Sequence, residues 1–261
     1  MKHYALIGEK LGHSMSVPIH EAIFRHMGIE ADYRLVELSR EGFRQGVAEL
    51  MQSMDGFNVT IPYKQDVIPL LHSIDPAARA IGAVNTVLTG DSCRGFNTDV
   101  SGFTTMLRMH GISPEGRPCY VLGGGGTSRT ACTALRQMGA SRVTVVSRQP
   151  AEGQIGYDQL TEEFSGILVN TTPAGMWPRV DGCPVSADAL PSILRRAEGV
   201  ADVIYNPPET VLTAAAKKYD VPACTGMSML IAQAVEAESI WQGFPMPEDL
   251  TPTLVKELKL L

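Results

Sequence analysis

The stretch PCYVLGGGGTS, residues 118–128, decides the fold of the second half of this 261-residue chain. An apolar run typical of a buried strand leads into four glycines, and a helical pattern continues to about Met138. The first glycine permits a tight turn, the next lets the backbone approach a pyrophosphate, and the small Ser128 lets helix and strand pack closely. N–H groups at such a helix start bind anions. A glycine run alone also suits a plain turn, but the flanking strand and helix favour a dinucleotide-binding unit.

The segment after the next strand indicates which dinucleotide binds. That strand is expected over 142–146 and is followed by Ser147-Arg148-Gln149. Enzymes that use NAD usually place a carboxylate there, about 20 residues beyond the glycine loop, to hold the ribose 2′-hydroxyl. This segment has no acid, and the guanidinium of Arg148 matches a 2′-phosphate in bidentate geometry. A surface arginine after a strand is common in itself, but together with the missing acid it favours NADP over NAD.

Strand and helix patterns alternate along the chain. Strands are expected at 4–7, 32–38, 56–60, 83–88, 118–122, 142–146, 167–170 and 200–205. Helices are expected at about 19–27, 41–51, 62–71, 99–110 and 126–138, and again from 226 onward. This alternation predicts an α/β fold with mostly parallel sheets, in two units joined by the helix at 99–110. The helical tail, broken by prolines before a last short helix, is expected to pack back on the first unit.

The composition excludes several classes of protein. The 44% hydrophobic and 19% charged residues are ordinary for a globular chain, which argues against disorder. Lys and Arg number 22 against 28 Asp and Glu, and a net charge of -6 argues against nucleic-acid binding through the overall field. No apolar run is long enough to span a membrane, and the apolar start is too short for a signal peptide. We therefore expect a cytoplasmic protein.

The five cysteines do not suggest a disulfide framework or a zinc site. Their number is odd, and no C-x-x-C pair occurs. Small buried hydrophobic residues in a reducing cytosol are the expected role for all of them. They are Cys93, Cys119, Cys132, Cys183 and Cys224.

Polar clusters fall near several predicted strand ends in the first half. They are Ser14 with Ser16, the segment 58–64, Asn85-Thr86, and the segment 97–99. Ligands of open α/β sheets bind outside the carboxyl ends of the strands, so these clusters are candidates for one shared cleft. Each also has a plain structural explanation. Ser16 and Asp99 suit helix caps, and Lys64 suits a solvated surface position.

A series of segments resembles, in order, the motifs of the shikimate dehydrogenase family. They are GEKLGHSMS (8–16) with His20, NVTIPYK (58–64), GAVNT (82–86), FNTD (96–99), the glycine loop, Ser147-Arg148, NTTPAGM (170–176), DVIYNP (202–207) and GMSMLIAQA (226–234). Together they cover nearly the whole chain. Thr127 and Ser147 stand where the family more often has alanine and asparagine, and Glu152 where some members carry a second basic residue.

The resemblance implies a fold and an activity. The fold is two α/β domains: a substrate-binding and catalytic domain over 1–98, completed by helices in 232–261, and a Rossmann-type NADP-binding domain over 99–231. The C-terminal helix returns to the first domain. The activity is reduction of 3-dehydroshikimate to shikimate with NADPH, a step of chorismate and aromatic amino acid biosynthesis.

The resemblance also implies the site residues. Lys64 and Asp99 would be the catalytic pair. The substrate would be bound by Ser14, Ser16, Thr60, Asn85, Tyr205 and Gln233. The cofactor site would be lined by Gly123, Gly124, Gly125, Gly126, Thr127, Ser147, Arg148, Val203, Gly226 and Met229. No metal is expected, since no His, Cys and carboxylate cluster has ligand spacing.

The chemistry fits the proposed pair, and two alternatives stay open. Hydride addition to a ketone leaves negative charge on its oxygen, and Lys64 is protonated at pH 7 and able to neutralise it. One alternative is a relative that acts on quinate or a related polyol, with NAD. The other is a non-catalytic ligand sensor on the same fold, which the retention of Lys64 and Asp99 argues against. The expected partner is a small molecule, with no nucleic acid and no membrane, and the chain is expected to be a monomer or homodimer.

Overall fold

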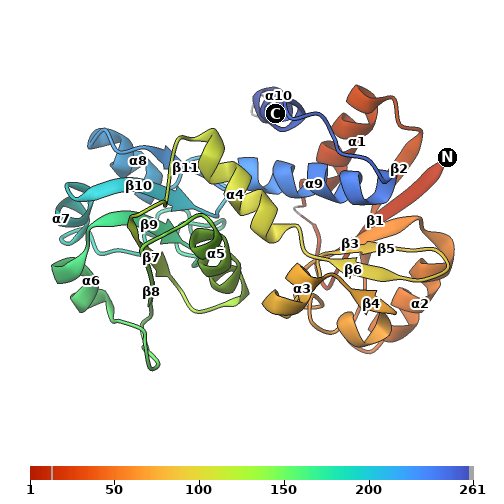
Figure 1. The fold of residues 1–261 in the computed structure, drawn as a ribbon, viewed down its shortest axis with the longest axis horizontal. Coiled ribbons are helices and arrows are strands. Elements are labelled where there is room, and N and C mark those ends of the chain that lie inside the picture. Colours follow the sequence, from red (N-terminus) through yellow and green to blue (C-terminus); the bar gives the residue numbers. More distant parts are fainter. Residues whose placement is uncertain (13, 259–261) are drawn as a thin grey trace. The chain divides into compact units, whose positions relative to one another are not determined.

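The chain forms two compact units in a computed structural model that describes residues 1–12 and 14–258 (Figure 1). The first unit is Met1–Asp99 with Gln233–Leu261, and the second is Val100–Ala232. These boundaries lie one residue from the domain limits expected from the sequence. His13, part of the first family motif, lies outside the described residues. The roles expected of the two domains stay predictions at this point.

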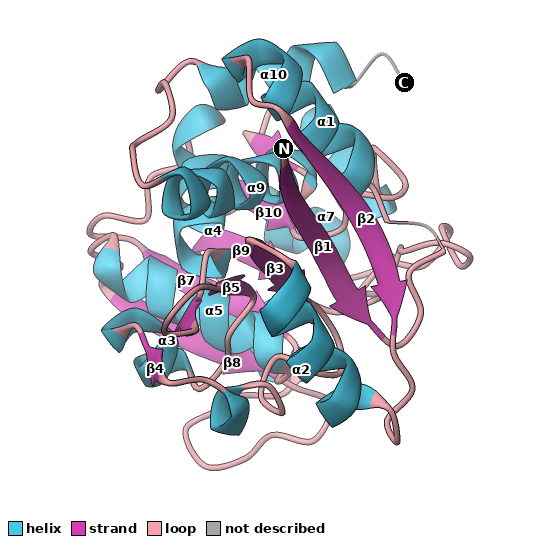
Figure 2. Cartoon of the chain, turned by 90° about the vertical axis from the view of Figure 1, so that its right-hand side faces the viewer, coloured by secondary structure: helices cyan, strands magenta, loops and turns pink. Residues whose placement is uncertain are grey.

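The sheet of the first unit has parallel and antiparallel parts. Its strands are β1 (Lys2–Gly8), β2 (Ala31–Glu37), β3 (Gly56–Val59), β4 (Ser73–Ile74), β5 (Thr86–Leu88) and β6 (Arg94–Phe96), in the order β2-β1-β3-β5-β6-β4. Figure 2 shows β1 and β2 side by side and running the same way. β5 is antiparallel to both β3 and β6. The prediction of a mostly parallel sheet is wrong for β5. This strand is antiparallel to β6 because the two are joined by a short turn at Gly90 rather than by a helix.

Helices cover both faces of this sheet. They are α1 (Ser16–Met27), α2 (Phe43–Ser53), α3 (Pro76–Ile81), part of α9 (Met227–Gln242), and α10 (Leu250–Leu258). β1 alternates between two cores, as a strand covered on both faces must. Ala5 and Ile7 pack in the core with α2, and Tyr4 and Leu6 pack in the core with α1 and α9. The predicted return of the tail to the first unit is confirmed, since α10 packs on α1.

The helix predicted over 62–71 is wrong. The chain turns after β3 and forms only one short 3₁₀ helix, η1 (Ile68–Leu70). The carbonyl of Lys64, which would accept from Ile68 in an α-helix, accepts instead from the N–H of Val84 at 2.8 Å. Pro69 has no N–H to donate to the next carbonyl. The segment therefore stays open around Lys64.

The second unit has a fully parallel sheet. Its strands are β7 (Pro118–Leu122), β8 (Arg142–Val146), β9 (Gly166–Asn170), β10 (Ala197–Asp202) and β11 (Ala223–Cys224), in the order β11-β10-β9-β7-β8. Its helices are α4 (Asp99–Met109), α5 (Gly126–Gln137), α6 (Tyr157–Glu163), α7 (Leu190–Leu194), α8 (Val211–Lys218) and the first residues of α9. Since β8 and β9 flank β7, the strand order reverses between β7 and β9. Open α/β sheets bind their ligands at this point.

The strand expected at 200–205 ends earlier. β10 begins at Ala197 and stops at Asp202, because the Asp202 carboxylate accepts the N–H of Ile204 at 3.1 Å and turns the chain.

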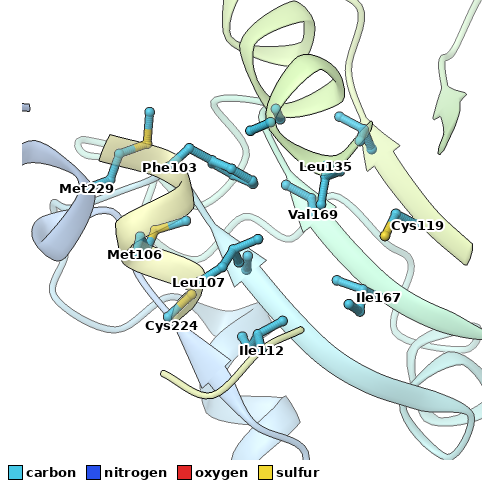
Figure 3. Packing of buried hydrophobic residues seen from close by; sticks show 14 of the residues in the cluster. Phe103, Met106, Leu107, Ile112, Cys119, Leu135, Ile167, Val169, Cys224 and Met229 are labelled. Atoms are coloured by element: carbon cyan, nitrogen blue, oxygen red, sulfur yellow. The ribbon is translucent and has the colours of Figure 1, made fainter. Parts of the chain in front are cut away.

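The core of the second unit includes three of the five cysteines. Phe103, Met106 and Leu107 of α4 face Ile167 and Val169 of β9 (Figure 3). The buried cysteines of this cluster are Cys119, Cys132 and Cys224. Burial raises the pKa of each of their thiols. Cys93 is buried in the first unit, while Cys183 is only half-buried. Among residues 1–12 and 14–258, no helix combines the length and apolar character needed to cross a bilayer.

The absence of a side chain at Gly56 leaves room for Trp241 of α9, which packs on the sheet there. The indole of Trp241 stacks on Tyr4 with ring centroids 4.5 Å apart, and its Nε1 donates to the carbonyl of Val87 at 2.9 Å. A Cβ on Gly56 would lie 2.6 Å from Cδ1 of Trp241.

We therefore predict that Gly56→Ala lowers the free energy of unfolding by roughly 1–3 kcal/mol, the usual cost of overpacking a core. Urea unfolding followed by circular dichroism measures it. Gly42→Ala is the control, because Gly42 has a φ of -82° and faces only Ser39. Equal stability of the two variants would contradict the docking role of Gly56.

Candidate active site

The sheet order of the first unit gathers the predicted polar clusters at one edge. β1, β3 and β6 run in one direction and β5 runs in the other. The carboxyl ends of β1, β3 and β6 and the amino end of β5 therefore share an edge. Thr60 follows β3, the segment 97–99 follows β6, and Asn85 precedes β5.

Lys64 and Asp99 form an ion pair at this edge. Lys64 Nζ donates to Asp99 Oδ2 at 2.8 Å, and the side chains are 29% and 10% exposed. Asn85 Nδ2 donates to Asp99 Oδ1 at 3.0 Å. Asn85 is held in turn, because its Oδ1 accepts the N–H of Thr98 at 2.8 Å. An ammonium group thus sits at the surface of the edge, fixed by a buried carboxylate and a buried amide.

Asn97 lies just before α4, and its Oδ1 accepts the N–H of Asp99, the first residue of that helix, at 2.9 Å. The Asp99 carboxylate itself accepts from Lys64 and Asn85. The surface position considered for Lys64 is only partly correct, because the side chain is paired and mostly covered.

The two serines contact each other in the turn before α1. Ser14 Oγ donates to Ser16 Oγ at 3.1 Å and accepts the N–H of Ser16 at 3.2 Å. Ser16 is the first residue of α1 rather than its cap position, which Met15 occupies without a side-chain cap. Thr60 is half-buried and lies beside the end of β1, where a Cβ on Gly8 would meet its methyl group at 2.7 Å. Gln233 is half-buried on α9.

Two polar residues of this unit that were given no individual role are linked to Asn85: Tyr33 was not a candidate, and Asn58 was included only as part of the polar segment 58–64. The hydroxyl of Tyr33 on β2 donates to Asn58 Oδ1 at 2.7 Å, and Asn58 Nδ2 donates to the carbonyl of Asn85 at 3.1 Å. In the sequence, Tyr33 is only a strand residue with an apolar ring. Asn58 lies within a family motif, but no spacing rule marks it.

The glycine loop of the second unit lies at the carboxyl end of β7. Gly123 has a φ of +103°, and a Cβ there would press on Thr171 Oγ1 at 3.1 Å, so a larger residue is disfavoured. Around Gly124, Gly125 and Gly126 nothing lies within 4 Å of a Cβ position. The loop therefore leaves open space in front of the first N–H groups of α5. This geometry fits a pyrophosphate.

The end of β8 presents the predicted 2′-phosphate residue. The Ser147 hydroxyl donates to the carbonyl of Gln149 and accepts its N–H, both at 3.2 Å, which fixes a turn. Arg148, inside that turn, is exposed. An exposed guanidinium without a neighbouring carboxylate in its turn fits a phosphate group.

The remaining predicted residues of the second unit follow β10 or lie at the start of α9 (Met227–Gln242). Gly226 donates its N–H to the carbonyl of Ile204 at 2.8 Å, and a Cβ there would collide with the carbonyl of Val203. Met229 is buried in the core, with 6% of its surface exposed (Figure 3). Tyr205 is half-buried, and burial raises the pKa of its hydroxyl, which stays a donor at neutral pH.

Comparison with known proteins bears on both units. Residues 6–87 match the model of the shikimate dehydrogenase substrate binding domain. A shikimate dehydrogenase (NADP(+)) of Clostridium beijerinckii is 38% identical to this chain over 97% of both chains. The chain belongs to the shikimate dehydrogenase family. The resemblance drawn from the sequence motifs is thereby confirmed.

Solved structures of the shikimate dehydrogenase family have the same fold. A chorismate mutase/shikimate 5-dehydrogenase fusion protein from Clostridium acetobutylicum has a TM-score of 0.94 and 35% identity, covering 99% of this chain and 97% of that chain. Shikimate 5-dehydrogenase of Thermus thermophilus, in complex with NADP(H) and shikimate, has a TM-score of 0.85 and 30% identity, with coverage of 97% and 98%. The predicted class of two α/β domains with a Rossmann-type fold is confirmed.

A buried carboxylate joins two family motifs of the second unit. Asp202 at the end of β10 accepts from Asn170 Nδ2 at 3.0 Å and from the hydroxyl of Thr210 at 2.8 Å. Thr210 also caps α8. These partners are neutral donors, and burial raises the pKa of Asp202 to about 6 from an ordinary 3.8.

This pKa predicts a pH dependence of stability. Between pH about 4 and 6 the folded chain holds a proton on Asp202 that the unfolded chain has lost. The resulting stabilisation is complete below the unfolded pKa and is lost as the pH rises through the folded pKa. We expect Asp202→Asn, which has no such proton, to gain up to about 3 kcal/mol in free energy of unfolding relative to wild type between pH 4 and 7.

Urea unfolding at these pH values measures the difference. Asp220→Asn is the control, because Asp220 is exposed and has a φ of +56°, which asparagine tolerates. A variant-to-wild-type difference that is constant with pH would show that the buried carboxylate titrates normally.

Proposed function

We propose that this chain is an NADP-linked shikimate dehydrogenase that reduces 3-dehydroshikimate to shikimate with NADPH. The observation that carries this proposal is the Lys64–Asp99 ion pair at 2.8 Å, anchored by Asn85 at the strand edge of the first unit. That unit is then the substrate domain, and the second unit is the NADP domain. The enzyme is proposed to act in the cytoplasm as a monomer or homodimer.

Lys64 is the proposed proton donor. NADPH, when bound, supplies a hydride to the ketone carbon, and the C=O bond becomes a C–O bond that bears negative charge. Lys64 gives a proton from its ammonium group to this oxygen, which completes the hydroxyl. Asp99 holds Lys64 in place and accepts a hydrogen bond from a substrate hydroxyl.

Small polar side chains are proposed to bind the ring of the substrate. Ser14 and Ser16 donate to its carboxylate. Its hydroxyl groups are bound by Thr60, Asn85, Tyr205 and Gln233. Because a substrate that fails to pair these groups leaves buried donors unsatisfied, such a site discriminates strongly between polyols.

The cofactor is proposed to bind the second unit through backbone and guanidinium groups. The pyrophosphate lies against the N–H groups of the glycine loop, where the open space around 124–126 fits it. Arg148 binds the 2′-phosphate, and Ser147 and Thr127 add hydroxyls. The nicotinamide half contacts Val203, Gly226 and Met229.

One assay tests this function. Absorbance at the nicotinamide band is followed with shikimate or quinate, each with NADP or NAD. The proposal expects the highest kcat/KM with shikimate and NADP. Preference for quinate or NAD would assign the chain to the related polyol dehydrogenases, and absence of turnover with every pair would indicate a ligand sensor.

For the cofactor, we predict that Arg148→Ala weakens NADP binding by roughly 10- to 150-fold and leaves NAD binding nearly unchanged. A charge-assisted contact of about 1.5–3 kcal/mol is lost only when the 2′-phosphate is present. Titration calorimetry with both cofactors measures the effect. Arg136→Ala, an exposed arginine at the other end of α5, is the control. Equal losses for NADP and NAD would remove Arg148 from the 2′-phosphate site.

For the proton donor, we predict that Lys64→Ala lowers kcat by about 10²–10⁴-fold while most shikimate affinity remains. Asp99→Asn should lower both. The double variant should lose little more than the worse single variant, because residues that act as one unit give non-additive losses. Lys256→Ala, on the exposed side of α10, controls for the loss of a lysine. Near-normal turnover of folded Lys64→Ala would mean that another group donates the proton.

A further inference from the structure

A series of polar contacts leads from the proposed carboxylate-binding serines to a buried tyrosine. Ser14 donates to Ser16 at 3.1 Å, and the Ser16 side chain interacts with the hydroxyl of Tyr33. The Tyr33 hydroxyl donates to Asn58 Oδ1 at 2.7 Å. Tyr33 is 5% exposed and belongs to the buried core formed with α1 and α9.

The same series reaches the catalytic pair on the other side. Asn58 Nδ2 donates to Thr86 Oγ1 at 3.0 Å, and Thr86 donates to Asn85 Oδ1 at 3.0 Å. Asn85 then donates to Asp99. From Tyr33 to Asn85, each residue both accepts and donates, so the orientations of the Asn58 and Thr86 side chains depend on the Tyr33 hydroxyl.

The ring of Tyr33 is fixed from behind by a second buried pair. It stacks on the imidazole of His20, with centroids 3.9 Å apart and planes 7° apart. His20 Nδ1 lies 2.7 Å from Glu238 Oε1, and the two side chains are 2% and 0% exposed. Gln242 Nε2 donates to the other oxygen of Glu238 at 3.0 Å. His20 is one helical turn after Ser16 on α1, so this stack also holds the helix that carries Ser16.

The hydroxyl of Tyr33 is a permanent donor. Burial raises its pKa well above 10, so it stays protonated at neutral pH. Its removal leaves Asn58 Oδ1 without this donor and Ser16 without this polar neighbour. A buried polar group left unpaired costs about 1–3 kcal/mol.

We propose that Tyr33 is a positioning residue of the substrate site: its buried hydroxyl orients the Asn58 amide beside Asn85 and gives Ser16 a polar neighbour, and His20 with Glu238 holds its ring. The inference rests on the proposed function, because it assigns Ser16 to the substrate carboxylate. Tyr33 acts on substrate affinity. Lys64 and Asp99 keep their own anchor, since the Thr98 N–H holds Asn85 independently.

The first test compares Tyr33→Phe with Tyr4→Phe. Tyr4 is opposite Tyr33 on β1 and fully buried, and its hydroxyl bonds Gln242 at 3.1 Å, so Tyr4→Phe also loses a buried hydroxyl. We expect Tyr33→Phe to raise the KM for shikimate by roughly 5- to 30-fold. Its kcat and its KM for NADP should stay within about twofold of wild type, as should all constants of Tyr4→Phe. In a Ser16→Ala background, Tyr33→Phe should add little.

Outcomes of this test separate the inference from the proposed function. Wild-type turnover of shikimate tests the function by itself. Where the wild type is active, an unchanged shikimate KM in Tyr33→Phe overturns the inference. So does an equal rise in Tyr4→Phe, which indicates a general loss of packing.

A second measurement keeps the hydroxyl and does not depend on turnover. With 3-fluorotyrosine at position 33, the ¹⁹F resonance should shift on addition of shikimate and stay in place on addition of NADP. The same label at position 4 should not respond to shikimate. Absence of a shift at position 33 under saturating shikimate overturns the inference even if Tyr33→Phe fails to fold.

Discussion

The arrangement of the strand edge in the first unit is explained by one constraint: the mostly buried Asp99 carboxylate needs hydrogen-bond donors. A carboxylate that is 10% exposed is costly unless it is paired. Its donors come from two separate places, Lys64 in the turn after β3 and Asn85 before β5. The antiparallel hairpin of β5 and β6 makes this possible, because it returns the chain to the edge where β3 ends. The open turn after β3 also supplies a donor, because it carries Lys64, which donates to Asp99. An α-helix there would have taken up the Lys64 carbonyl that now binds Val84.

The two units use one topological device for different chemistry. In each, the strand order reverses beside the first strand of the unit, at the carboxyl ends of β1 and β3 or of β7 and β9. The first unit fills this edge with side chains that end in ammonium, amide and hydroxyl groups. The second leaves its edge almost bare, so that backbone N–H groups of the glycine loop are the available donors. Side chains suit a ring with several distinct hydroxyls, while a bare backbone suits a diphosphate, which requires close approach more than selectivity.

A feature of this structure is predictable from the sequence when the residues that determine it are close together in the chain. The strand at 118–122 and the glycine loop were predictable, since their signals lie within a few neighbouring residues. The helix predicted at 62–71 failed because a carbonyl of Lys64 binds Val84, 20 residues away, and no local pattern encodes that bond. The residues proposed for the site came from motif resemblance. Tyr33 was missed, and Asn58 was given no role of its own, because the two residues meet only through the pairing of β2, β1 and β3.

Two buried aspartates show why residue type and position alone do not assign a role. Asp99 and Asp202 both lie near the end of a strand. The Asp99 carboxylate accepts hydrogen bonds from Lys64 and Asn85, and the Asp202 carboxylate accepts them from Asn170 and Thr210. Asp99 faces an ammonium group, which it keeps in place at a partly exposed edge. Asp202 faces only neutral donors, and burial raises its pKa to about 6. A carboxylate paired with an ammonium group, which can donate a proton, is suited to chemistry on a ligand. A carboxylate surrounded by amides and hydroxyls is suited to holding two loops together. The charge of the donors, more than the burial of the acid, therefore distinguishes the aspartate proposed for catalysis from the structural one.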